Sequence, residues 1–354
     1  MHEGELTTCG PARGPVPIKA RGRHLVVDIH CHMGSAAAEA IVRAAPRPAT
    51  PPPAAPVSVL TREVNRRQIE AVGEKLNGVE ARLAEMDRLG IDVQVVSPSP
   101  GQYYYAADPD VGLAASRAIN DRIAEAVASH PDRLAGMGNL PLQAPELAVA
   151  ELRRCVSELG LRGVEICTNV NGRDLSDPAL TPFFAAAEAL GVVVFIHPMG
   201  FNHPRFAEHY FSNVIGNPLE STLAVGHLIF GGVLERLPGL KVCVAHGGGY
   251  LPAYFGRMDH VHRARPDGRE HIARPPSSYL RRIWLDTLVF DRAQRDFLIA
   301  THGPDRLCLG SDWPFDMGEP DPVGFHDDLP DEVRAKLLGL NAASLFGLEV
   351  AASA

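Results

Sequence analysis

The chain has 354 residues, and its 45% hydrophobic content is enough for a large buried core, so a globally disordered chain is excluded. Lys and Arg total 34 against 42 Asp and Glu, and the net charge of -8 argues against nucleic acid or anionic lipid as a partner. No apolar run reaches the ~18 residues of a membrane span, and the acidic start is unlike a signal peptide. The cysteines form no CxxC pair, as expected for reduced thiols. We therefore expect a cytoplasmic protein without a membrane segment.

Short runs rich in β-branched residues alternate with helical patterns from residue 24 onward. The predicted strands are 24–32, 92–97, 134–140, 162–168, 192–197, 241–246, 283–289 and 306–311. The predicted helices are 110–129, 145–159, 177–190 and 217–236, the last opening on Asn217 and Glu220 in the spacing of a capping box. Strands that alternate with helices favour parallel pairing. Eight such units predict an α/β fold, the (β/α)8 TIM barrel, with a doubly wound open sheet as the alternative.

A single barrel domain is expected over residues 24–348, between an N-terminal extension at 1–23 and a C-terminal tail at 349–354. A long segment, 33–90, separates the first two predicted strands. Its proline-rich part at 44–57 is predicted to be an extended loop, and 62–89 is predicted to be helical. Because the segment leaves the C-terminal end of a barrel strand, we interpret 33–90 as an insertion that covers the mouth as a lid. A solvated spacer is the alternative.

Polar residues occupy the ends of several predicted strands. His30 and His32 alternate along the first strand, so their side chains point to one face, which Asp28 shares and Cys31 does not. Three later strands also end in a polar residue: His197, His246 and Asp312. Because the C-terminal ends of parallel barrel strands meet at one rim, we expect these histidines and Asp312 to converge there. Imidazoles with one carboxylate suit zinc or another first-row divalent ion.

Sequence motifs at the same strand ends resemble a known enzyme group. The first strand carries HCH, the fifth ends in HP, the sixth in HGGG, and the eighth is followed by SDWPF. Supporting stretches include EARLAEMDRLGIDVQVVS, HLIFGGVLERLPGLKVCVAHGGG and DRLCLGSDWPFDMGE. Over residues 25–348 the chain resembles the amidohydrolase superfamily, and more narrowly its branch typified by aminocarboxymuconate-semialdehyde decarboxylase.

The resemblance implies roles for the matching residues. The metal ligands would be His30, His32, His197 and Asp312. The catalytic residues would be His246, as acid/base group close to the metal, and Asp312. Arg257 would reach a substrate carboxylate in the neighbouring subunit, which implies a homodimer. A second substrate arginine is assigned to Arg67 in competition with Arg62 and Arg66, and the pocket would be lined by the aromatic side chains of Trp313 and Phe315.

The number of metal ions follows from the fourth predicted strand. Many amidohydrolases bridge two metals with a carboxylated lysine there, but 162–168 contains no lysine, so one metal is predicted unless Glu165 bridges. After His197 the chain reads PMGFNH where the decarboxylase carries a tryptophan, so the pocket wall is expected to differ.

We therefore predict a metal-dependent, non-oxidative decarboxylase, a carboxy-lyase, with one divalent ion, Zn²⁺ first and Mn²⁺ as the alternative. Its small-molecule substrate would be an unsaturated or aromatic carboxylate, similar to a carboxymuconate semialdehyde or a hydroxybenzoate. Hydrolysis or hydration of a ring-cleavage product on the same site is the alternative. A catalytically silent scaffold is disfavoured because no expected ligand is missing.

Overall fold

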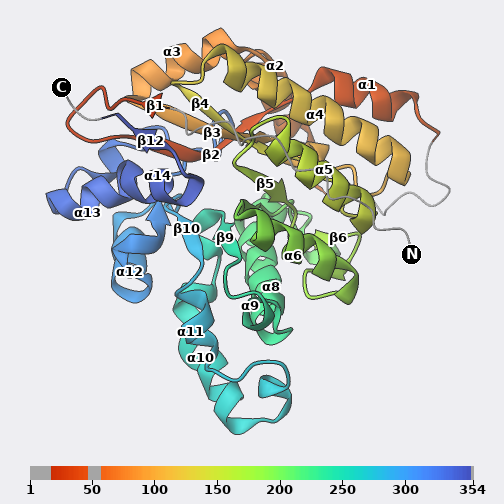
Figure 1. Cartoon of the computed structure of the whole chain (residues 1–354), viewed down its shortest axis with the longest axis vertical. Helices are drawn as coiled ribbons and strands as arrows, with labels where there is room; N and C mark the ends of the chain where they lie inside the picture. Colours follow the sequence, from red (N-terminus) through yellow and green to blue (C-terminus); the bar gives the residue numbers. More distant parts are fainter. Residues whose placement is uncertain (1–16, 47–56, 352–354) are drawn as a thin grey trace, which may run out of the picture.

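The computed structural model describes residues 17–46 and 57–351, so most of the proline-rich stretch at 44–57 lies outside the described residues, as do the outer parts of both predicted tails. Its centre is a parallel eight-stranded sheet in the order β11-β10-β9-β8-β5-β4-β3-β2 (Figure 1). The strands are β2 (Val27–Met33), β3 (Val93–Pro98), β4 (Leu134–Gly138), β5 (Gly163–Ile166), β8 (Val193–Ile196), β9 (Lys241–Val244), β10 (Trp284–Asp286) and β11 (Leu307–Cys308). All eight predicted strands are confirmed.

The sheet closes where the chain beyond β11 meets β2. The Ile29 N–H donates to the Leu309 carbonyl at 3.0 Å, and Cys31 and Trp313 form a parallel β-bridge. Because the first and last strands meet in this way, the fold is the predicted (β/α)8 TIM barrel and the open-sheet alternative is wrong.

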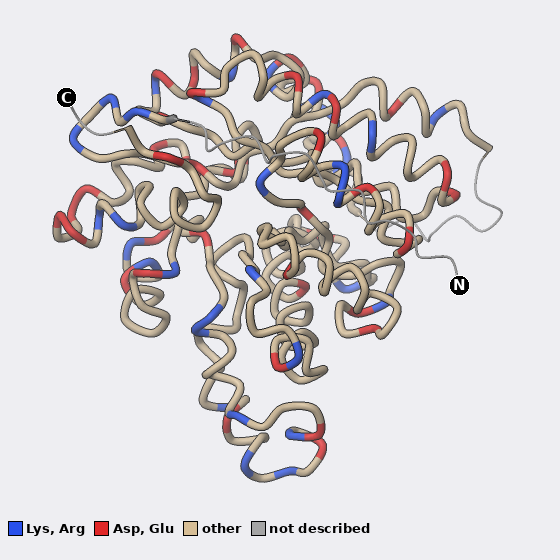
Figure 2. Tube along the Cα trace, in the orientation of Figure 1, with Lys and Arg blue, Asp and Glu red and all other residues tan. Residues whose placement is uncertain are grey.

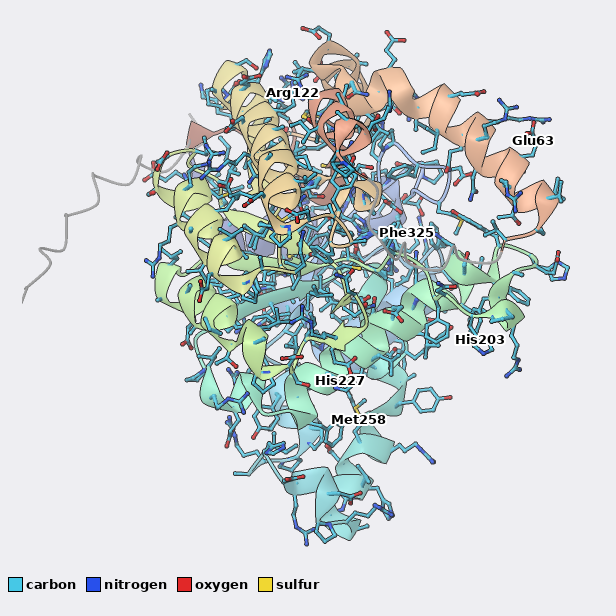
Figure 3. All side chains as sticks on the ribbon, turned by 90° about the vertical axis from the view of Figure 1, so that its right-hand side faces the viewer. Glu63, Arg122, His203, His227, Met258 and Phe325 are labelled. Atoms are coloured by element: carbon cyan, nitrogen blue, oxygen red, sulfur yellow. The ribbon has the colours of Figure 1, made fainter. Side chains whose placement is uncertain are left out.

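Helices surround the barrel strands (Figure 1). Side chains fill the space between the helices and the strands (Figure 3). The helices between the strands and after β11 are α1 (Ala36–Ala44), α2 (Val59–Asn77), α3 (Val79–Leu89), α4 (Pro109–Ser129), α5 (Pro145–Ser157), α6 (Thr181–Leu190), α7 (Phe211–Val214), α8 (Gly216–Phe230), α9 (Val233–Arg236), α10 (Leu251–Ala264), α11 (Pro276–Leu280), α12 (Arg292–His302), α13 (Asp331–Ala335) and α14 (Asn341–Phe346). One apolar layer lies between α6, α8 and the strands, where Phe183, Val225 and Leu228 are fully buried. None of the described helices is long and apolar enough to cross a membrane.

The predicted helices form with two differences. The 62–89 pattern gives two helices that meet at Gly78, and 217–236 gives α8 and α9. The capping box predicted for α8 does not form, because the side chains of Asn217 and Glu220 bind neighbouring loops instead. Asn217 Oδ1 accepts the Gly200 N–H at 2.6 Å, and Glu220 Oε2 accepts the Thr168 hydroxyl at 2.6 Å. The start of α8 is thus fixed by tertiary contacts at the barrel mouth.

The two ends of the described chain pair with each other. Pro17–Ile18 (β1) and Glu349–Val350 (β12) form a short parallel ladder. The described parts of the predicted extension and tail therefore contact each other. Basic and acidic residues are interspersed along the trace (Figure 2).

Candidate metal centre

The C-terminal ends of the barrel strands bring together all five residues that the sequence singled out. His30 and His32 come from β2, and the other three follow β8, β9 and β11: His197, His246 and Asp312. One possible ligand atom from each of His30, His197, His246 and Asp312 lies within 4.8 Å of the others. His32 joins this cluster through its Nε2 atom, which is 3.0 Å from Asp312 Oδ1.

Hydrogen bonds on the far side of two imidazoles decide which nitrogen faces the cluster. The Nδ1 of His30 lies 2.6 Å from Asp286 Oδ2, and the Nδ1 of His32 lies 2.8 Å from the Pro98 carbonyl. A carbonyl oxygen can only accept, so His32 Nδ1 carries the proton and Nε2 presents a lone pair to Asp312. A lone pair and a carboxylate oxygen 3.0 Å apart repel each other unless a metal ion or a second ring proton lies between them, so this pair fits a metal site.

The electrostatics of the site point to the same requirement. Burial alone would lower the pKa of His30, but the negative charges of Asp312 and Asp286 raise that pKa well above its usual range. Burial would raise the pKa of Asp312, but the facing histidines, His30 first, hold it well below its usual value. The buried carboxylates therefore attract positive charge.

The pKa of His197 is shifted in the opposite direction from that of His30. Burial, followed by the neighbouring histidines, lowers its pKa well below the usual range, so its imidazole stays neutral. Neither ring nitrogen of His197 has a hydrogen-bond partner, although both are buried. A neutral, buried and unpartnered imidazole beside an ionised carboxylate fits a metal ligand, so the described residues form a candidate metal site.

Glu165 and Asp28 lie beside the cluster. Tyr103 donates to Glu165 Oε1 at 2.8 Å, and burial raises the Glu165 pKa. Asp28 does not share the face of His30 and His32 as predicted. A register shift in β2 between Asp28 and Cys31 interrupts the alternation of side chains along the strand. Asp28 Oδ2 therefore accepts from Gln94, whose Oε1 accepts from Arg82 of α3, and Asp28 lies on the helix side of the strand.

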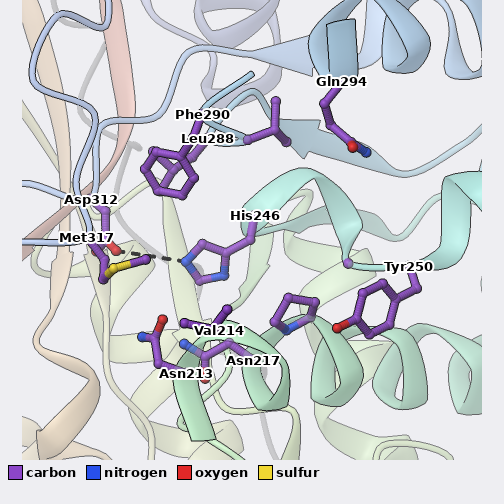
Figure 4. Close-up of a pocket in the computed structure, with 13 residues that line it drawn as sticks. Asn213, Val214, Asn217, His246, Tyr250, Leu288, Phe290, Gln294, Asp312 and Met317 are labelled. Carbon is purple, nitrogen blue, oxygen red and sulfur yellow. Dashed lines mark ion pairs between the residues drawn. The ribbon is translucent and has the colours of Figure 1, made fainter. Parts of the chain in front are cut away.

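Two hollows of about 280 and 350 Å³ open beside the cluster. His246 lines the first and His197 the second, and Asp312 lines both. Figure 4 shows the first hollow, with His246 at its centre and its Nε2 directed toward Asp312 Oδ2, 3.8 Å away. By contrast, the His30 and His32 side chains are fully buried. The deep histidines thus hold the floor of the site, and His246 faces the space where a substrate can enter.

Of the two aromatic residues predicted to line the substrate pocket, only one lies at a hollow. Phe315 lines the second hollow with its ring 5.5 Å from that of His32. Trp313 does not reach either hollow: it is buried in the outer apolar layer, where the Arg82 guanidinium lies 4.5 Å from its ring. Asp312 has a φ of 58°, and this turn directs its own side chain into the site and the side chain of Trp313 outward.

The arginines named from the sequence are exposed. Arg67 binds Glu63 at 2.8 Å on the outer side of α2, where Figure 3 shows Glu63, and its side chain is 71% exposed. Arg62 and Arg66 are on the same helix, and Arg66 also pairs with Glu63. The structure therefore does not bring Arg67 to the hollows of its own chain. Arg257 is exposed on α10, without an ion pair in the described part of the chain.

Two residues that hold the site were missed by sequence reasoning. Asp286 ends β10 and binds His30, and its signal was an acidic residue inside the apolar run IWLDTLV. Arg82 is fully buried and donates to the His32 carbonyl and, at 2.8 Å, to Gln94 Oε1. Nothing in the helical pattern of α3 distinguished Arg82 from its exposed neighbours.

Comparison with known proteins agrees with this geometry. A family model described as Amidohydrolase matches residues 27–348. The chain belongs to the amidohydrolase family. The 2-amino-3-carboxymuconate-6-semialdehyde decarboxylase of Dictyostelium discoideum is 40% identical to this amidohydrolase over 276 residues, covering 76% of this chain and 77% of the relative.

Solved structures share the fold of this amidohydrolase. The 5-carboxyvanillate decarboxylase from Sphingomonas paucimobilis superposes with a TM-score of 0.82 at 27% identity, covering 92% of this chain and 99% of that one. A dihydroxybenzoic acid decarboxylase from Polaromonas sp., solved with bound manganese and the inhibitor 2-nitroresorcinol, gives a TM-score of 0.74 at 23% identity, covering 92% and 97%. At that identity the second likeness shows the fold alone.

Proposed function

We propose that this amidohydrolase removes CO₂ non-oxidatively from an unsaturated or aromatic carboxylate, with one divalent metal ion in the candidate site. The observation that carries the proposal is the pair of facing acceptors, His32 Nε2 and Asp312 Oδ1, beside the unpartnered imidazole of His197. The 40% identity to a decarboxylase over three quarters of both chains supports the reaction type.

The ligands in this proposal are His30, His32, His197 and Asp312, because the first two are fully buried in the cluster and the last two line the hollow above them. Zn²⁺ is our first choice for this imidazole-rich donor set, and Mn²⁺ is the alternative. When bound, such an ion supplies Lewis acidity and, in the case of zinc, lowers the pKa of water to about 7. We do not propose Glu165 as a bridge, because its Oε1 accepts from Tyr103 and its Oε2 faces Nδ1 of His32, the ring nitrogen away from Asp312.

His246 is the proposed acid/base group. Its side chain is 15% exposed and lines the hollow, and its Nδ1 has no hydrogen-bond partner. Decarboxylation breaks the bond between the ring or chain carbon and the carboxylate, leaves an electron pair on the conjugated substrate and requires a proton on that carbon. His246 is the titratable group at the right place to deliver that proton, and Asp312 orients it from 3.8 Å.

A substrate with a second carboxylate needs a positive group, and none is found among the described residues at the two hollows. The residues that line the two hollows include no Lys and no Arg. We propose that Arg257 of a second copy supplies it in a homodimer. Exposed apolar side chains surround the hollow next to α10 and support a contact there: Val214, Ile215, Tyr250, Tyr254 and Phe290.

We also propose that the protein works in the cytoplasm. The five cysteines in the described residues are buried free thiols: Cys31, Cys155, Cys167, Cys243 and Cys308. Five thiols without a disulfide among them support a reducing compartment.

The proposed reaction is tested with protein whose metal content has been determined. The protein is incubated with ¹³C-carboxyl-labelled hydroxybenzoates and carboxymuconate semialdehydes, and released ¹³CO₂ is measured by mass spectrometry while ultraviolet spectra follow the substrate. We expect labelled CO₂ in a 1:1 ratio with substrate loss for at least one compound. Substrate loss without CO₂, with water added to the product, would instead establish hydrolysis or hydration on the same site.

A further inference from the structure

Asp286 makes two different sets of contacts with its two carboxylate oxygens. It ends β10 and is fully buried. Its Oδ2 lies 2.6 Å from His30 Nδ1, whereas its Oδ1 accepts the backbone N–H of Gly247 at 2.9 Å and of Leu288 at 3.2 Å. One carboxylate therefore joins a deep histidine of the metal site to the loop that carries His246.

The first oxygen controls which nitrogen of His30 faces the site. An ionised carboxylate only accepts hydrogen bonds, so Nδ1 of His30 keeps its proton when the ring gives up the other one to bind a metal. The lone pair is then on Nε2, which lies 3.4 Å from Asp312 Oδ1. Carboxylates in this position typically fix the tautomer and orientation of a metal-binding histidine.

The second oxygen controls the backbone directly after His246. His246 and the following three glycines all have positive φ angles, 56° for His246 and 62° for Gly247. This strained turn aims the His246 ring into the hollow, and the Gly247 N–H is held by Asp286 from outside the turn. Loss of that acceptor would leave a buried N–H without a partner.

The neighbouring strand leaves room for this carboxylate. A Cβ atom on Gly310 would lie 2.9 Å from the His30 Cβ, 3.0 Å from the Asp286 Cβ and 3.3 Å from Asp286 Oδ2. Contacts under 3.0 Å force atoms apart, so any side chain at position 310 would separate Asp286 from His30. The absence of a side chain there keeps the pair in contact.

We propose that Asp286 is a positioning residue that sets both the metal-binding nitrogen of His30 and the direction of His246. This inference rests on the proposed metal-dependent function. It predicts that one substitution at a residue outside both hollows weakens metal binding and also slows turnover.

The variant Asp286→Asn tests the proposal because an amide has only one acceptor. If its oxygen keeps the Gly247 and Leu288 N–H groups, its NH₂ faces His30 Nδ1 and moves the ring proton to Nε2, the metal-binding atom. We expect the Zn²⁺ dissociation constant, measured by competition with a chromogenic chelator, to rise 10- to 100-fold. We also expect kcat at saturating Zn²⁺ to fall while KM stays close to the wild-type value.

Asp92→Asn is the matched control. Asp92 is 3% exposed and accepts two backbone N–H groups, from Arg21 at 2.9 Å and Val26 at 2.8 Å, next to the N-terminal end of β3. The Asp92→Asn substitution should lower thermal stability without changing the Zn²⁺ dissociation constant. A merely structural role for Asp286 predicts that both variants lose stability alike and that neither changes metal affinity, and that result would overturn the proposal.

Gly310→Ala keeps the test decisive if Asp286→Asn does not fold. The added methyl group should weaken Zn²⁺ binding by separating Asp286 from His30. A folded Gly310→Ala variant with the wild-type dissociation constant would contradict the inference. If the wild-type protein itself binds no metal, the proposed function fails instead, so the two failures are distinguishable.

Discussion

Positive φ angles gather at the residues that face the substrate space. His246 and Asp312 have φ values of 56° and 58°, and Phe290 and Tyr210, which line the hollows, have 60° and 58°. Left-handed backbone costs of order 1–3 kcal/mol at a residue other than glycine. Four such residues at the two hollows indicate that the fold gives up stability to direct these side chains.

The assignment of roles within the cluster predicts a contrast between two histidines. His32→Ala should leave a folded barrel with little bound metal, because it removes a buried ligand. His246→Ala should retain its metal and lose about 10²- to 10⁴-fold in kcat, the usual contribution of an acid/base group. Metal content by plasma mass spectrometry, measured beside the rates, checks both. If metal is lost from His246→Ala and kept by His32→Ala, the two roles must be exchanged.

Individual site residues could be predicted where the barrel topology alone decides their place. His197 and His246 follow apolar strands, and the meeting of strand ends brings them together in any closed barrel. Asp28 and Trp313 could not be placed from alternation, because a bulge in β2 and the turn at Asp312 decide which way they point. Such local irregularities depend on tertiary contacts that a pattern of residue types does not contain.

At the scale of elements, helix α2 forms one wall of the mouth. Asn65, Gln68 and Ile69 line the same hollow as His197 and Asp312, whereas Arg66 and Glu63 bind each other on the outer side. Ile69 is 55% exposed although it is apolar. This placement supports the interpretation of 33–90 as a covering insertion over that of a solvated spacer.

A covering role for α2 predicts that its two sides differ in substrate binding. Ile69→Ala should raise KM several-fold without changing metal content, since it removes apolar surface from the hollow. Arg66→Ala, on the outer side, is the matched control and should leave KM unchanged. Equal kinetics for both variants would favour the spacer.

The HGGG turn makes a separate prediction about stability. Gly249 has a φ of 68°, and a Cβ there would lie 2.2 Å from the Pro218 carbonyl oxygen. Gly191, after α6, has a φ of 66° but open space around a Cβ. Gly191→Ala should therefore cost on the order of 1 kcal/mol of unfolding free energy, and Gly249→Ala several-fold more. Urea denaturation measures both, and equal losses would mean that the close contact is relieved by a shift of α8.

Most elements could be predicted because their signals are local. Asp177 caps the turn before α6, Gly191 ends that helix in a left-handed conformation, and strand β3 is buried on both faces. The insertion was less predictable, because Gly78 divides its helical pattern into α2 and α3. The ladder between β1 and β12 was not predictable either, because it joins residues too distant in sequence for any local signal.

At the scale of the whole molecule, the proposed dimer accounts for an exposed cation beside exposed apolar surface. Arg257 lies in the middle of α10, and α10 and α11 form an arm that extends away from the barrel (Figure 1). Tyr254 on the same helix is 56% exposed. An arm of this kind can carry a side chain into the hollow of a second copy related by twofold symmetry.

Mixing two inactive variants tests this arrangement. Arg257→Ala should lose substrate affinity while its metal content is unchanged, and His246→Ala should lose turnover. If the arginine acts across the dimer, a heterodimer of the two variants has one intact site, and complete subunit exchange should restore about a quarter of the wild-type activity. An absence of recovery, with exchange shown by native mass spectrometry, would place Arg257 outside the partner's site.

The most direct test of the central claim is a metal titration of the chelator-treated protein, with decarboxylation measured at each addition of Zn²⁺ or Mn²⁺. The four proposed ligands (His30, His32, His197 and Asp312) surround a single site, which predicts that activity rises linearly and reaches its maximum at one ion per chain. Full activity in the metal-free protein, or a maximum only at two ions per chain, would contradict a mononuclear metal-dependent decarboxylase.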